Sequence, residues 1–234
     1  MESTVITASD LSKSKGWQFS LFSSEAKNLD RVLKGSSFDA VPLRDIVLAR
    51  SRGFPQMGTA QLKKEDGIPL LSVQSITPQG VDIEAVGKFI SVEEHAKLSN
   101  TQVFPGDVLV SSFIRSEGAV ASVYGSKEPA NLTSSLIRLK VDQRRVLPGY
   151  LVAFFNSSIG VALLRRYAIG SVQPTLNLAI LLDLPIPLPP IDLQQEIIDA
   201  IDEKLQEATL LEKTAENLRL EASSLIERLL SLEE

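Results

Sequence analysis

The stretch "LPIPLPPIDLQQEIIDAIDEK", residues 184–204, decides how this chain is organised. Four prolines fall between Pro185 and Pro190. Proline fixes its own φ angle and lacks a backbone N–H, so this run predicts a stiff, extended joint. A helix is predicted directly after it, with Asp192 as the N-cap and Gln195 at the capping-box position. The chain therefore divides into a body before the prolines and a helix after them.

The segment from Asp192 to Glu234 contains no proline or glycine. Its apolar residues recur every seven positions in two series offset by three, which is the a/d pattern of a coiled coil. A helix of this length spans on the order of 60 Å. Alone it would leave an apolar seam in water, so we predict dimerisation through the seam or pairing with a partner protein. Folding back onto the chain's own body is the alternative. The predicted dimerisation residues are Ile201, Ala208, Leu211, Ala215, Leu218, Ala222, Leu225 and Leu229.

The body has an ordinary core-forming composition, since the whole chain of 234 residues is 44% hydrophobic and 23% charged. Short runs rich in β-branched residues and bounded by turn residues predict strands within residues 68–77, 106–114, 118–125 and 134–141. Helical patterns cover residues 23–35, 91–100 and 148–168, and the last of these has a predicted break near residues 156–158.

These patterns place the protein in the α+β class. A mixed α/β domain over residues 1–187 is predicted to precede a long C-terminal coiled-coil helix over residues 188–234. Its sheet should be mostly antiparallel or mixed. No apolar segment is long enough to span a membrane, so no membrane partner is expected.

Charge is distributed unevenly between the two parts. The net charge of the chain is −5, with +3 over residues 1–190 and −8 over residues 191–234. A mildly basic body permits contact with a polyanion even though the average pI is near 5.1. The absence of cysteine excludes disulfides and thiolate chemistry, and it suits a cytoplasmic location.

Catalytic motifs are missing. His95 is the only histidine, and it lies in a polar helical stretch that predicts a surface position. One histidine without cysteine does not support a usual metal site or a Ser-His-Asp triad. The triplet Glu25-Ala26-Lys27, with Asp10 upstream, resembles a metal-dependent nuclease only loosely, and Glu25 suits the first turn of a helix. We therefore predict a non-catalytic protein without a metal or cofactor.

Polar and basic side chains gather instead in the loops of the body. Arginine, lysine, glutamine and serine are the residues that contact phosphates and base edges in nucleic-acid complexes. The predicted DNA-binding residues are Arg50, Arg52, Gln56, Lys63, Lys64, Gln74, Ser111, Ser112, Arg115, Ser171 and Gln173.

The segment "GSVQPTLNLAILLDLPIPLPPIDLQQEI", residues 170–197, resembles the specificity (S) subunits of Type I restriction–modification enzymes. That family carries a Gly-Ser-x-Gln-Pro-x-Leu-Asn segment, then Leu-Pro-Ile-Pro-Leu-Pro-Pro and a helix start that contains glutamine. The upstream stretches 68–98, 103–124 and 133–157 resemble the same family's target-recognition domain. Thr175 and Leu193 depart from the pattern, because the family often has asparagine at the first position and an acidic residue at the second.

The resemblance implies a DNA sequence-recognition subunit. A full S subunit has two recognition domains and two long helices, whereas this chain has one of each, so it resembles a half-subunit or half of a longer chain. The implied partners are double-stranded DNA, methyltransferase (M) subunits that bind S-adenosylmethionine, a restriction (R) subunit in the full complex, and a second copy of the chain. The alternatives are the recognition portion of a fused restriction–methylation enzyme and a coiled-coil protein-binding adaptor.

Overall fold

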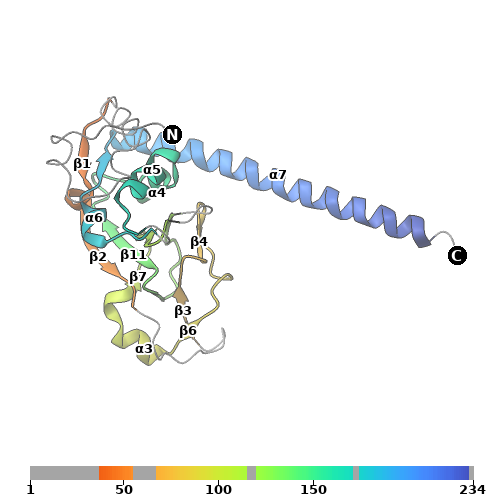
Figure 1. Ribbon diagram of the computed structural model, residues 1–234, viewed down its shortest axis with the longest axis horizontal. Helices are drawn as coiled ribbons and strands as arrows, with labels where there is room; N and C mark the ends of the chain where they lie inside the picture. Colours follow the sequence, from red (N-terminus) through yellow and green to blue (C-terminus); the bar gives the residue numbers. More distant parts are fainter. Residues whose placement is uncertain (1–36, 55–66, 115–119, 171–173, 232–234) are drawn as a thin grey trace. The chain divides into compact units, whose positions relative to one another are not determined.

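The computed structural model describes residues 37–54, 67–114, 120–170 and 174–231, with side chains described only as far as Leu225. The chain divides into two compact units, Met1–Gln195 and Glu196–Glu234. We refer to them as unit 1 and unit 2. Unit 1 contains the described strands and the short helices, and unit 2 contains most of a single long helix (Figure 1). The division falls after the start of that helix, whereas the sequence analysis placed the boundary at residues 187/188.

Unit 1 is built on two four-stranded sheets, where the sequence analysis expected one. The first has the order β2-β11-β8-β9, and all its pairs are antiparallel. The second has the order β6-β3-β10-β7 and is mixed, because β10 and β3 run parallel. The strands are β2 (Val47–Arg52), β3 (Ile68–Leu71), β6 (Phe89–Ile90), β7 (Gln102–Val103), β8 (Val108–Ser111), β9 (Ala121–Val123), β10 (Ala130–Leu132) and β11 (Leu136–Val141).

The two sheets share one apolar core. Leu71 and Leu132 come from the mixed sheet, Leu109 and Leu136 come from the antiparallel sheet, and all four are fully buried. The predicted strand over residues 68–77 is interrupted inside this core region. It ends at Leu71 and resumes as β4 (Ile76–Thr77), which pairs with β5 (Gly80–Val81). The serine hydroxyls explain the interruption, because they bond to nearby backbone groups and compete with strand pairing.

The short helices follow their local signals. α3 (Val92–Lys97) has the predicted capping box between Ser91 and Glu94, and the short 3-10 helix η4 (Ser99–Thr101) follows it. The predicted helix over residues 148–168 forms as α4 (Pro148–Asn156) and α5 (Ser158–Tyr167). Its predicted break lies at Ser157, whose hydroxyl accepts a hydrogen bond from Gly160 N. α6 (Leu178–Leu182) begins after Asn177, which caps it. Within unit 1, α4 and α5 lie toward one end and α3 toward the other (Figure 1).

The proline run is part of unit 1 and is not a free joint. Its centre forms β12 (Pro185–Pro187), which pairs antiparallel with β1 (Ala40–Pro42). Leu43 N donates to Leu184 O at 2.9 Å, and Leu188 N donates to Asp39 O at 3.0 Å, so the pairing continues at both ends. Between β1 and β2 lies the short 3-10 helix η2 (Leu43–Ile46). The stiffness expected from the prolines is therefore reinforced by a partner strand about 145 residues earlier in the chain.

The long helix α7 (Ile191–Ser231) has 41 residues. It begins one residue before the predicted N-cap, so Asp192 lies in its first turn. Gln194, which is fully buried, fastens that first turn to unit 1. Its side-chain oxygen accepts from Leu147 N at 2.8 Å, and its nitrogen donates to Arg145 O at 3.0 Å and to Pro189 O at 2.8 Å. The predicted α+β class with a long C-terminal helix is confirmed.

Beyond its first turn, α7 exposes apolar side chains along its length. The exposed fraction is 62% for Leu211, 59% for Leu218 and 54% for Leu225. The seam residues Ala208, Ala215 and Ala222 are also exposed, and Ile201 is 37% exposed. Leu229 lies in α7, but its side chain is outside the described part. In the described residues, no helix is both long and apolar enough to cross a membrane.

Candidate nucleic-acid interface

Four residues from two segments form a hydrogen-bonded site that we call the serine platform: Ser112, Thr133, Ser134 and Ser135. Ser112 Oγ donates to Ser134 O at 3.0 Å, and Ser112 N donates to Ser135 O at 2.8 Å. The hydroxyls of Thr133 and Ser135 lie 2.6 Å apart, and Ser135 Oγ also accepts from Val73 N at 3.3 Å. The serine platform therefore joins the end of β8 to the turn between β10 and β11.

Described residues that flank three undescribed segments form hydrogen bonds at or next to the serine platform. Residues 55–66 begin after Phe54, whose carbonyl accepts from Ser134 N at 2.9 Å. Residues 115–119 begin after Ile114, whose N–H donates to Pro174 O at 3.0 Å. Residues 171–173 end before Pro174, and Leu176 N donates to Ser112 O at 2.8 Å. Segments far apart in the sequence are thus brought to one place on unit 1.

Six predicted DNA-binding residues lie outside the described residues, all within these three segments. Gln56, Lys63 and Lys64 belong to residues 55–66, Arg115 begins residues 115–119, and Ser171 and Gln173 belong to residues 171–173.

Arg50 and Arg52 lie on β2, at the edge of the antiparallel sheet. Both are exposed and, because they are two residues apart on a strand, they share one face of it. Arg52 Nε donates to Ser134 O at 3.1 Å, which ties this side chain to the serine platform. Within the described part of the chain, no hydrogen bond or ion pair joins Arg50 to another residue.

Ser111 and Ser112 are buried, with exposed fractions of 1% and 0%. Ser111 Oγ donates to Phe113 O at 2.6 Å, and Ser112 Oγ bonds to Ser134 as described above. Their hydroxyls are used inside unit 1, so we assign them a structural role in place of the predicted DNA contact. Gln74 is exposed in the turn that follows β3, and its backbone N–H donates to Ser72 Oγ at 3.3 Å.

Sequence reasoning missed Ser134 and Ser135. The signal available was only a polar pair, "SS", before a strand-like run, which is typical of any turn. Their importance follows from distant partners: Ser112 lies 22 residues before Ser134, and Val73 lies 62 residues before Ser135.

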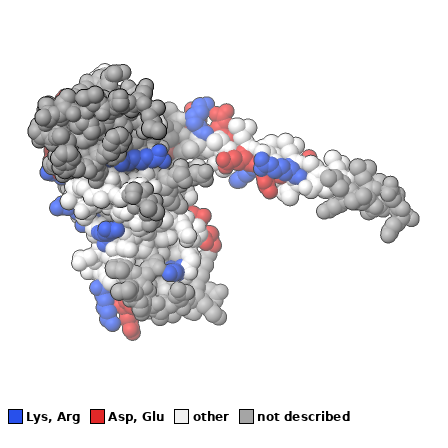
Figure 2. Space-filling view, in the orientation of Figure 1, with Lys and Arg blue, Asp and Glu red and all other residues white. Residues whose placement is uncertain are grey.

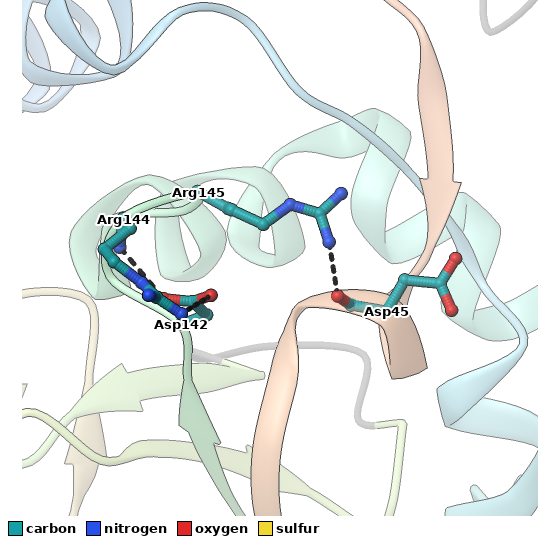
Figure 3. A network of polar contacts seen from close by, with 4 residues as sticks. All are labelled: Asp45, Asp142, Arg144 and Arg145. Atoms are coloured by element: carbon teal, nitrogen blue, oxygen red, sulfur yellow. Dashed lines mark hydrogen bonds and ion pairs between the residues drawn. The ribbon is translucent and has the colours of Figure 1, made fainter.

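Two other arginines of unit 1, Arg144 and Arg145, are held by hydrogen bonds. Arg144 contacts both carboxylate oxygens of Asp142, at 2.9 and 3.0 Å. The hydrogen bonds between these two side chains lower the pKa of Asp142 and raise the pKa of Arg144. Arg145 turns the other way and donates to the backbone carbonyl of Asp45 at 2.6 Å (Figure 3). Basic residues on the visible face of unit 1 form separate patches (Figure 2).

His95 is half-buried, so it lies at the surface only in part. Its Nδ1 lies within hydrogen-bonding distance of Asn131 Oδ1, and Asn131 is fully buried. The amide nitrogen of Asn131 donates to Leu98 O at 3.1 Å and to Thr101 Oγ1 at 2.7 Å. These contacts fasten α3 and η4 to β10. Among the described residues, no three acidic or histidine side chains are grouped to hold a metal ion.

The observed structure is a mixed α/β module that carries the serine platform and continues into a long helix. A family model described as "Type I restriction modification DNA specificity domain" matches residues 36–222. The chain belongs to this family, and the resemblance found in its sequence is confirmed.

A curated relative supports the same family. The chain is 25% identical, over 169 residues, to the Type I restriction enzyme EcoBI specificity subunit of Escherichia coli. The match covers 71% of this chain and 35% of that protein. This chain therefore spans about a third of the length of its curated relative.

Solved structures share the fold. The HsdS subunit from Thermoanaerobacter tengcongensis matches with a TM-score of 0.52 and 15% identity, covering 80% of this chain and 46% of that one. A chain from a study of type I R-M system assembly matches with a TM-score of 0.55 and 14% identity, covering 80% and 47%. The type IIG restriction endonuclease BpuSI matches with a TM-score of 0.56 and 12% identity, covering 79% and 29%. At these identities the likeness concerns the fold alone.

Proposed function

We propose that this chain is the DNA sequence-recognition subunit of a Type I restriction–modification methyltransferase complex, and that unit 1 reads one half of a split site in double-stranded DNA. The observation that carries the proposal is the serine platform, where Ser112 and Ser134 bring together the described residues Arg52, Phe54 and Leu176. Sequence is read by several side chains that reach base edges together, while neighbouring basic groups hold the phosphates. Membership of the DNA specificity domain family supports this role.

We further propose that the chain itself is not catalytic. M subunits would bind S-adenosylmethionine and methylate adenine, and an R subunit would cut DNA in the full complex. This part rests on the family to which the chain belongs. It agrees with the cytoplasmic location expected from the sequence.

The proposed assembly is a homodimer of half-subunits that pairs through α7 and docks M subunits. One observation supports it: α7 exposes a regular seam of alanine and leucine. Two helices that bury these seams against each other would remove the leucines from water.

The test is methylation mapping in cells that carry the chain and its methyltransferase partner. We expect methylated adenines within one short, repeated sequence motif, and we expect the methylation to disappear when this chain is deleted while the methyltransferase is kept. Methylation that persists with an unchanged motif after the deletion would contradict the proposed function.

A second candidate is the recognition portion of a longer fused enzyme. It is favoured by one observation, that the same fold occurs within the type IIG restriction endonuclease BpuSI. An immunoblot of the native host with an antibody against unit 1 separates the two candidates. The half-subunit predicts a band near 25.5 kDa, and the fused enzyme predicts a much larger one.

A further inference from the structure

We propose that Arg52 is a specificity-determining residue that reads a guanine through paired hydrogen bonds to O6 and N7, and that Arg50 contacts phosphate. The proposal rests on the proposed function, in which unit 1 reads DNA. It assigns different roles to two arginines that the sequence alone does not distinguish.

One hydrogen bond holds Arg52 to the serine platform. Its Nε donates to Ser134 O at 3.1 Å. An arginine side chain has several freely rotating bonds, and ordering it on DNA has an entropic cost. Anchoring Nε to a backbone carbonyl removes part of that cost before DNA arrives. It also fixes the plane of the guanidinium group relative to unit 1.

The anchored geometry leaves suitable donors for a base. The guanidinium group has five N–H donors in a planar fork, and only the one on Nε is used by Ser134. The two terminal nitrogens match the adjacent O6 and N7 acceptors of guanine, which is the commonest specific contact in the major groove. Arg52 is exposed, so its terminal nitrogens are not enclosed by the core.

Ser134 O accepts a second hydrogen bond, from Ser112 Oγ at 3.0 Å. Ser112 is fully buried and lies directly after β8. Its hydroxyl therefore helps to fix the carbonyl that orients Arg52. This makes Ser112 a positioning residue for the proposed base contact, in place of the direct DNA contact predicted from the sequence.

Arg50 lies on the same face of β2 but has no such anchor among the described residues. It faces Leu139 across the sheet, whereas Arg52 faces Ile137 and reaches the turn that contains Ser134. An exposed arginine suits a phosphate, which accepts hydrogen bonds from many directions and needs no fixed plane. The two residues should therefore differ in what their loss does to binding.

Other described arginines are less suited to reading a base. Arg44 pairs with Asp183 at 3.0 Å, and Arg144 pairs with Asp142 at 2.9 Å. Arg138 is largely buried, lies 3.7 Å from Asp107 and donates to Gln102 O. Each would have to leave a carboxylate before it met the acceptors of guanine. Arg144 is therefore a matched control, because it is an exposed arginine of unit 1 away from the serine platform.

The experiment uses the full chain co-expressed with the methyltransferase that the proposed function requires. Bound duplexes are selected from a randomised double-stranded pool by wild type, Arg52→Lys, Arg50→Ala and Arg144→Lys. Arg52→Lys keeps the charge but lacks the fork, so preference for guanine at one position should fall by about 5- to 150-fold while the other positions stay unchanged. Arg50→Ala should weaken binding to all sequences equally and lower the salt slope by about 1.

Ser112→Ala provides a second variant for the positioning role. It should reduce preference at the same guanine position as Arg52→Lys and at no other. A merely structural role would weaken all positions together.

Three results would overturn the inference: full retention of every base preference by Arg52→Lys, a uniform loss of affinity in that variant without relaxed preference, or the same relaxation in Arg144→Lys. Wild type that selects no sequence at all would instead contradict the proposed function. The two failures are therefore distinguishable.

Discussion

At the scale of the residue, Gln194 shows how one side chain fastens the first turn of α7 to the rest of unit 1. It is fully buried, and its amide bonds to backbone groups of Leu147, Arg145 and Pro189. These groups belong to the start of α4, the preceding loop and the proline run. A buried amide that satisfies three backbone groups is costly to remove, because each group left unpaired keeps its desolvation penalty.

We predict that Gln194→Leu lowers the free energy of unfolding by about 2–5 kcal/mol, since three backbone groups would lose their partner at a fully buried side chain. Urea denaturation of the purified chain measures this. Gln206→Leu makes the same chemical change at an exposed position of α7 and should stay within about 0.5 kcal/mol of wild type. Equal effects of the two substitutions would contradict the assigned role of Gln194.

Asp107 provides a prediction about pH. Burial raises the pKa of Asp107 above 3.8, against the lowering effects of the Phe104 N–H and Arg138. The folded state therefore holds this proton more tightly than the unfolded state. The contribution of the Asp107 carboxyl to the free energy of unfolding therefore falls as the pH rises from about 3.8 through the pKa of Asp107 in the folded state.

Asp107→Asn removes that titration. From pH 3.5 to pH 7 the wild type should lose free energy of unfolding that the variant keeps, so the free energy of unfolding of the variant minus that of wild type should increase. Urea midpoints at the two pH values give the comparison. If the difference in free energy of unfolding between variant and wild type is the same at both pH values, or is smaller at pH 7, the pKa of Asp107 is not raised.

At the scale of the element, α7 is a helix whose sequence suits a partner. Ala208 and Ala215 alternate along the seam with Leu211 and Leu218, and all four are exposed. Small residues at one seam position and leucine at the other allow close approach of a second helix. Acidic and basic residues both occur along the visible surface of α7 (Figure 2).

We predict that the full chain dimerises and that placing Asp at both Leu218 and Leu225 yields a folded monomer, because two buried charges per helix would oppose pairing. Light scattering at micromolar concentration measures the mass, and circular dichroism checks that unit 1 remains folded.

The matched control places Asp at Leu210 and Leu220, which are 67% and 60% exposed but lie outside the seam. That variant should remain dimeric. A wild-type chain that is already monomeric, or a control that dissociates equally, would remove the seam as the dimer interface.

At the scale of the whole molecule, the proposed homodimer constrains the DNA site. Two identical recognition units related by a two-fold axis read the same half-site in opposite directions. An antiparallel pair of α7 helices supplies such an axis. The site should therefore be two inverted copies of one short sequence with an unread spacer between them.

We predict that deleting one heptad from α7 in the complex with its methyltransferase shortens the spacer or abolishes binding, while the half-site stays unchanged. Seven residues of helix correspond to about 10 Å, or roughly three base-pair steps. Methylation mapping with the deleted and native chains gives the two motifs. An asymmetric motif with the native chain would exclude the homodimer and indicate pairing with a different recognition domain.

The sequence by itself determined the features that depend on neighbouring residues. The capping box at Ser91, the break at Ser157 and the long helix after the prolines were all predicted, because caps and periodicity act within a few residues. The family also followed from a contiguous segment, residues 170–197.

Only the tertiary structure decided which distant groups meet. The proline run forms a strand because Ala40–Pro42 pairs with it. The predicted strand over residues 68–77 forms as two shorter strands, because hydrogen bonds between Ser72 and Ser75 interrupt it. Ser112 was predicted to contact DNA, but it is buried and donates a hydrogen bond to Ser134 O. Arg52 differs from Arg50 by its hydrogen bond to Ser134, which lies 82 residues later in the chain. Buried polar groups need hydrogen-bond partners, and the chain topology decides which distant groups are near enough to serve. The spacing of neighbouring residues in the sequence does not contain this information.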